Sequence, residues 1–171
     1  MNRARPTRRS RGFTFIELVV TLALVSVVAL SVLPLSEIVS TRMRETELRT
    51  ALRTLRSALD AYKAAVDQGQ IARETGQSGY PQSLDILVQG VPVATNNALT
   101  LTGAETPKRL VFLRQVPRDP FHPDVSVPAA QTWRTRAYGS PPDDPQPGDD
   151  VFDVSSASTR VGLNGIPYGD W

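Results

Sequence analysis

An apolar segment near the start of the chain limits what this sequence can fold into. It runs from Phe13 to Leu35 and contains a single charged residue, Glu17. At about 23 residues it is long enough to cross a bilayer as a helix. Residues 1–12 ahead of it hold five arginines and no acidic residue. Because basic residues stay on the cytoplasmic side of a membrane, we expect the rest of the chain on the opposite side.

The helical pattern continues beyond the apolar segment. Apolar residues recur at spacings of three and four, which predicts an amphipathic helix with one buried face. They are Leu48, Leu52, Leu55, Leu59, Tyr62 and Val66. Neither Gly nor Pro occurs from Leu35 to Gln68, and Gly69 is the expected stop. We therefore expect one helix from Phe13 to about Gln68. Pro34 should kink or weaken it, because proline removes a backbone hydrogen bond.

Charged residues on the other faces of this helix have local partners available. Glu45 and Arg49 are four residues apart, as are Arg56 and Asp60. Each pair is expected to stabilise the helix by roughly 0.2–0.5 kcal/mol.

The composition changes at Gly69, where glycine, proline, serine and threonine become frequent. We expect a short helix after Ser83, an exposed loop at 91–107, and strands at 132–138 and 151–155. The Pro-rich segment 140–150 reads as the loop between these strands. The hairpin and one further strand would form a sheet. The predicted fold class is α+β, with one long N-terminal helix packed on a small antiparallel β-sheet.

Residues 11–17 read Arg-Gly-Phe-Thr-Phe-Ile-Glu, where the basic residues 1–12 meet the apolar segment. This stretch resembles the cleavage and methylation signature of type IV pilins and type II secretion pseudopilins. The resemblance implies that a prepilin peptidase cuts between Gly12 and Phe13 and then N-methylates Phe13. It also matches Pro34 to a proline commonly found late in the apolar helix of that family.

Cleavage would create a charge that the sequence does not contain. The new α-amine of Phe13 would be cationic near neutral pH. Phe13 and Glu17 are four residues apart and would share one helix face. A carboxylate inside a membrane helix costs roughly 2.5–3.5 kcal/mol, so we expect Glu17 to have a partner. That partner is the Phe13 amine of its own chain or of a neighbouring copy, where it would set the axial stagger of a filament. The alternative is a polar residue tolerated near the membrane surface.

An ordinary secretory signal peptide is the rival interpretation of the N-terminus. Ala29-Leu30-Ser31 offers a weak cleavage site, after which the chain would begin at Val32. The length of the apolar segment and the charge of Glu17 inside it both argue against this alternative.

The later part of the chain resembles the major, G-type pseudopilin. The matching pieces are Leu59-Asp60-Ala61-Tyr62, Tyr80-Pro81, Asp119-Pro120-Phe121 and Asp153-Val154-Ser155. The resemblance divides the chain into a leader (1–12), a transmembrane and assembly helix (13–35), an amphipathic helix (36–68) and a periplasmic α+β region (69–171). It implies a single-pass protein of the bacterial inner membrane that polymerises with copies of itself into a periplasmic pseudopilus.

The same resemblance implies a function and a set of partners. The filament would drive export of folded proteins by a type II secretion system. The partners would be the prepilin peptidase, minor pseudopilins, the inner-membrane secretion platform and membrane lipid. The alternatives are a type IV or competence pilin used for adhesion, motility or DNA uptake, a minor pseudopilin at the filament tip, and a membrane-anchored periplasmic binding domain.

The G-type resemblance further implies a calcium site near the C-terminus, built from oxygen ligands in a loop. The candidate ligands here are Asp153, Asn164 and Asp170. The Gly-x-Asp-Gly stretch of the family is not evident, and Arg160 adds a positive charge nearby. A loop that binds no metal is the alternative.

Composition excludes several other classes of protein. The 171 residues include no cysteine, which rules out disulfides and thiolate metal sites. Without residues 1–12 the chain keeps 14 of its 19 basic residues against 17 acidic ones, a net charge of −3. The basic balance of the whole chain is therefore no reason to expect nucleic-acid binding. With one histidine and no nucleophile elbow, phosphate loop or zinc motif, we expect no enzyme.

Overall fold

The structure is a computed structural model that describes residues 12–94 and 108–171, without the side chains of residues 30–35. Most of the predicted leader and of the predicted loop 91–107 lies outside the described residues. The chain divides into two compact units, Met1–Thr41 and Arg42–Trp171. The elements are α1 (Phe15–Asp67), α2 (Leu84–Gln89), β1 (Val91–Pro92), β2 (Arg109–Leu110), the 3-10 helix η1 (Ala129–Thr132), β3 (Trp133–Arg136), β4 (Asp153–Ser156) and the 3-10 helix η2 (Tyr168–Asp170).

In the first unit, α1 presents apolar side chains on every side. All described residues from Phe13 to Ala29 are exposed, including Phe15 at 86 % and Val27 at 65 %. A helix that is apolar all round normally has other protein or lipid around it.

Two predictions for the apolar segment are not tested. Within the described residues no helix is long and apolar enough to cross a membrane, so the span at 13–35 stays a prediction. The α-helix continues through Pro34. The side chain of Pro34 lies outside the described residues, and the kink there also stays a prediction.

In the second unit, α1 forms one wall of the hydrophobic core. All six residues of the predicted apolar face are buried, and Leu48 and Leu55 are 0 % exposed. Each fully buried leucine stabilises the fold by roughly 1.5–3 kcal/mol. The helix ends with the Gly69 N–H donating to the Val66 carbonyl at 2.9 Å and the Gln70 N–H to the Ala65 carbonyl at 2.9 Å. Gly69 has a φ of 71°, as this type of helix end requires, so the predicted stop is confirmed.

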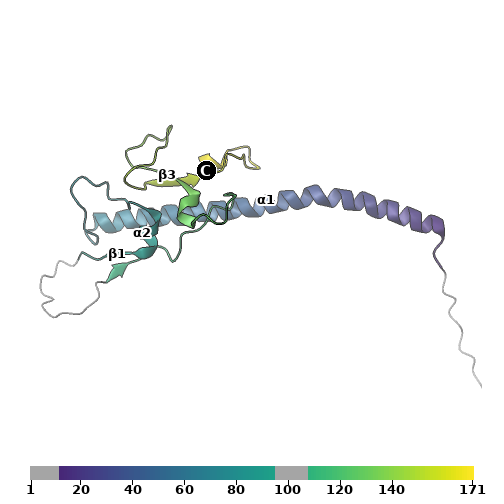
Figure 1. Ribbon diagram of the computed structural model, residues 1–171, viewed down its shortest axis with the longest axis horizontal. Coiled ribbons are helices and arrows are strands. Elements are labelled where there is room, and N and C mark those ends of the chain that lie inside the picture. Colours follow the sequence, from purple (N-terminus) through teal and green to yellow (C-terminus); the bar gives the residue numbers. More distant parts are fainter. Residues whose placement is uncertain (1–11, 95–107) are drawn as a thin grey trace, which may run out of the picture. The chain divides into compact units, whose positions relative to one another are not determined.

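The remaining elements of the second unit pack around this part of α1. Figure 1 shows α2 and β3 along this part of α1, and Leu87 of α2 and Trp133 of β3 belong to the same core as the apolar face of α1. The predicted hairpin is confirmed, because β3 and β4 pair antiparallel with Trp133 opposite Ser156. The prediction of a third strand in that sheet is wrong for the described residues. The other two strands, β1 and β2, form a separate two-stranded sheet. The short helix after Ser83 is confirmed as α2, with Leu84 and Leu87 buried.

A buried aspartate ties loops of the second unit to the hairpin. Asp119 is 0 % exposed. Its Oδ1 accepts from the Phe121 N–H at 2.8 Å, and its Oδ2 accepts from the Ser156 hydroxyl at 2.6 Å. Because both carboxylate oxygens are used, this buried charge is satisfied inside the fold. The Asp-Pro-Phe segment noted in the sequence therefore has a structural role.

Candidate processing and assembly site

The N-terminus of α1 is closed by a reciprocal pair of hydrogen bonds between Thr14 and Glu17. The Glu17 N–H donates to Thr14 Oγ1 at 3.3 Å, and the Thr14 N–H donates to Glu17 Oε2 at 3.4 Å. The Thr14 carbonyl accepts the first helical bond, from the Leu18 N–H at 3.1 Å. This arrangement is a capping box, in which two backbone donors left over at the helix start receive acceptors.

The capping box gives Glu17 a position that the sequence analysis did not foresee. A carboxylate in the first turn also interacts favourably with the positive end of the helix dipole. Both bonds are long and exposed, so the carboxylate stays accessible to a second partner. The Thr-x-x-Glu spacing ahead of an apolar run is the signal that could have identified Thr14.

Phe13 lies outside the helix, two residues before the first residue of α1. Its side chain is 80 % exposed. In the uncleaved chain Thr14, and not Phe13, is therefore the partner of Glu17 at the helix start, and a helix face shared by Phe13 and Glu17 after cleavage stays a prediction. The ion pair between the Phe13 amine and Glu17 would exist only after cleavage and stays a prediction.

Gly12 has no structural reason to be glycine. A side chain added at this position would meet no atom within 4 Å, and its φ lies outside the left-handed region. The fold of the described residues would tolerate an alanine or valine here. A demand for glycine at position 12 must therefore come from something that binds this segment.

Two of the three candidate calcium ligands already have other partners. The Asp153 carboxylate is taken by Arg56, whose Nε lies 2.8 Å from Oδ1, and lies 3.6 Å from Arg136 Nη2. Asn164 Oδ1 accepts from the Ile166 N–H at 3.1 Å. The part of the chain that the structure describes contains no cluster of three or more His, Asp or Glu side chains suited to a metal. Calcium binding by Asp153, Asn164 and Asp170 stays a prediction.

Two local ion pairs expected along α1 are replaced by long-range contacts. Arg56 bonds Asp153, 97 residues away, in place of Asp60. Glu45 is only 6 % exposed, and its Oε1 accepts from the Leu163 N–H at 2.6 Å and from the Tyr168 hydroxyl at 3.1 Å. Both contacts tie residues 153–171, the C-terminal segment, to α1. Local spacing could not have revealed them, because the partners lie far along the chain.

Burial in the second unit also changes the acidity of a tyrosine. Burial, and then the hydrogen bond to Glu45, raise the pKa of Tyr168 above its ordinary value. The Tyr168 ring stacks on Phe121 with ring centres 4.0 Å apart. The hydroxyl therefore stays protonated and serves as a donor to the buried carboxylate.

Comparison with known proteins identifies the N-terminal segment. Residues 7–33 match the family model described as the prokaryotic N-terminal methylation motif. No curated protein and no solved structure matches the chain. A motif of this kind implies processing by a prepilin peptidase and filament assembly in general. The match includes the Gly12–Phe13 bond, the capping box and Glu17, and this chain therefore carries a type IV pilin-like prepilin signal.

Proposed function

We propose that this chain is the major pseudopilin of a type II secretion system. Its role would be structural and not catalytic. Subunits would be stored in the inner membrane and would polymerise through α1 into a filament that drives the export of folded proteins. The observation that carries the proposal is the apolar surface on all sides of residues 13–29, within the segment that matches the methylation motif and directly after the Gly12–Phe13 bond. Such a surface is stable only against lipid or against other copies, and a membrane-stored filament subunit needs both in turn.

The capping box supports a specific role for Glu17 in polymerisation. Cleavage after Gly12 leaves both Thr14 and Glu17 in the mature chain, so the box survives it. The exposed carboxylate would then also reach the methylated Phe13 amine of a neighbouring copy. Inside an apolar fibre the low dielectric strengthens this attraction and penalises either charge left alone.

A matched pair of variants tests this role. Glu17→Gln and Glu37→Gln each remove one exposed carboxylate from α1. Both proteins should be cleaved after Gly12 in a host with prepilin peptidase. The Glu37→Gln protein should form filaments like the wild type, whereas the Glu17→Gln protein should yield at least about tenfold fewer. Normal filaments from the Glu17→Gln protein would show that its charge does not direct assembly.

Deletion of the gene separates secretion from the other uses of such filaments. If the chain is a pseudopilin, the deletion strain retains its exported enzymes in the periplasm and keeps surface motility and DNA uptake. Loss of motility or of DNA uptake with normal secretion would instead identify a type IV or competence pilin. Quantitative proteomics adds the copy number, which is high for a major subunit and low for a tip subunit.

A further inference from the structure

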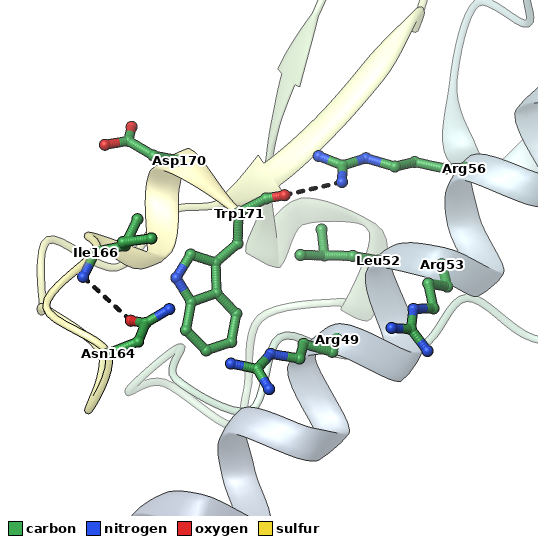
Figure 2. A pocket seen from close by; sticks show the side chains of 8 residues that line it. All are labelled: Arg49, Leu52, Arg53, Arg56, Asn164, Ile166, Asp170 and Trp171. Atoms are coloured by element: carbon green, nitrogen blue, oxygen red, sulfur yellow. Dashed lines mark hydrogen bonds between the residues drawn. The ribbon is translucent and has the colours of Figure 1, made fainter.

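A pocket of about 300 Å³ lies in the second unit between α1 and the C-terminal segment (Figure 2). Arg49, Arg53 and Arg56 project into it from α1, and Trp171 stands opposite them. These arginines lie one helical turn apart in succession, so they share a face of the helix. Because Arg56 is paired with Asp153, the positive charge left without an ion-pair partner is that of Arg49 and Arg53, against one lining carboxylate, Asp170.

The three arginines differ in what they already bind. Arg56 is fully engaged: it donates to the Asp153 carboxylate and to the main-chain oxygens of Val154 and Trp171, at 2.8–3.1 Å. Arg49 stacks on the Trp171 ring, 4.4 Å from its centre. Within the described residues neither Arg49 nor Arg53 has a carboxylate within ion-pair distance. Their hydrogen-bond donors are therefore free for a ligand, and the stacking on Trp171 fixes where Arg49 lies.

The opposite wall of the pocket presents one further donor. It is not the Trp171 Nε1–H, which is buried and points away from Arg49 and Arg53, toward Ile166 and Asn164 (Figure 2). Asn164 Oδ1 takes the Ile166 N–H, which leaves the Asn164 amide N–H₂ facing the indole (Figure 2). Asp170 lines the rim, but its carboxylate points away from the indole (Figure 2).

We propose that this pocket binds an oxyanion, a carboxylate or phosphate group, held between Arg49 and Arg53. Planar guanidinium groups match the two oxygens of such a group, and the bonds are charge-assisted. This inference goes beyond the proposed function, because it assigns a ligand to the folded second unit and does not involve the apolar helix.

Two sources could supply the oxyanion. One is a free anion such as phosphate. The other is an aspartate of a second copy, which rests on the proposed filament. The chain offers such aspartates at Asp143, Asp144, Asp149 and Asp150, in a loop without basic residues. Asp143 and Asp149 are exposed and make no hydrogen bond or ion pair within the described part of the chain.

Calorimetric titration of the full chain in a non-ionic detergent tests the proposal. One arm uses inorganic phosphate at constant ionic strength. The other uses a synthetic peptide of residues 139–150, and a second peptide with its four aspartates replaced by asparagine. Arg49→Gln and Arg53→Gln should each weaken binding at least about tenfold. Arg42→Gln, an exposed arginine of the same helix outside the pocket lining, should leave it unchanged.

Each result has a definite meaning. Binding of phosphate alone indicates a free anion, and binding of only the acidic peptide indicates a second copy. Both results support the pocket if Arg49 and Arg53 are required. If neither probe binds, or if binding persists in both pocket variants, the proposal is overturned. Because neither arm depends on cleavage at Gly12 or on filaments, failure here is distinguishable from failure of the proposed function.

Discussion

Glu45 is the buried carboxylate on which the docking of the C-terminal segment depends, and its removal gives the sharpest stability prediction. In Glu45→Ala, the Leu163 N–H and the Tyr168 hydroxyl both lose their acceptor. A buried polar group without a partner costs about 1–3 kcal/mol. Tyr168 is 0 % exposed and bears the full cost, whereas Leu163 is 51 % exposed and its N–H can be rehydrated. We expect a total loss of about 2–4 kcal/mol in the free energy of unfolding.

Conservative variants show how much of the stability loss comes from the Glu45 acceptor oxygen and how much from its charge or its size. Glu45→Gln keeps an acceptor oxygen with nearly the same shape and should cost less than about 1.5 kcal/mol. Tyr168→Phe removes one of the two donors. Because it breaks the same bond as Glu45→Ala, the double variant should cost less than the sum, with a coupling of about 0.5–3 kcal/mol. Glu47→Ala, an exposed glutamate of the same helix, should change stability by less than about 0.5 kcal/mol.

The assay is urea unfolding of the full chain in a non-ionic detergent, followed by tryptophan fluorescence. Trp171 belongs to the C-terminal segment and Trp133 lies in β3 of the same unit, so the signal reports on the docking directly. The reasoning is refuted if the free energy of unfolding of Glu45→Ala lies within about 0.5 kcal/mol of the wild-type value. It is refuted equally if the losses in free energy of unfolding caused by Glu45→Ala and Tyr168→Phe add up fully in the double variant.

Three further predictions concern the core, the response to pH and the processing site. Leu55→Ala removes a side chain that is 0 % exposed and should cost about 2–5 kcal/mol in urea unfolding, whereas Val125→Ala, at 86 % exposed, should be nearly neutral. Because the pKa of Tyr168 is raised, its protonated hydroxyl stabilises the fold, and this stabilisation is fully present below the ordinary tyrosine pKa of about 10. That contribution is lost as the pH rises above this value toward the folded pKa, so stability should fall more steeply there in the wild type than in Tyr168→Phe. Gly12→Val should leave the unfolding curve unchanged, because no atom lies near the new side chain, yet the precursor should persist uncleaved on a gel.

Periodic features of the sequence predicted the second unit well. The apolar face of α1 from Leu48 to Val66 and its stop at Gly69 depend on neighbours three to five residues apart, which can be read directly from the sequence. The β3–β4 hairpin followed from two short strand patterns on either side of a Pro-rich loop. The separate β1–β2 sheet was missed, because each of its strands is only two residues long and shows no alternation.

Charged residues were predicted less well, because their partners lie far along the chain. Arg56 and Glu45 each had a local partner four residues away, but the fold brings them Asp153 and the segment around Leu163 and Tyr168. Removing these charges from water is offset only by several well-placed bonds, which the folded C-terminal segment supplies. At the processing site, the glycine, phenylalanine and glutamate spacing was informative, whereas Thr14 was overlooked although its spacing to Glu17 is a known helix-start signal.

The central claim is that the functional chain begins at Phe13. The direct measurement is mass spectrometry of the N-terminal peptide of the chain, isolated from membranes of hosts with and without prepilin peptidase. We predict N-methylated Phe13 as the first residue in the host with the peptidase, and the intact basic leader in the host without it. A mature chain that starts at Val32, or that keeps residues 1–12 in both hosts, would contradict the account.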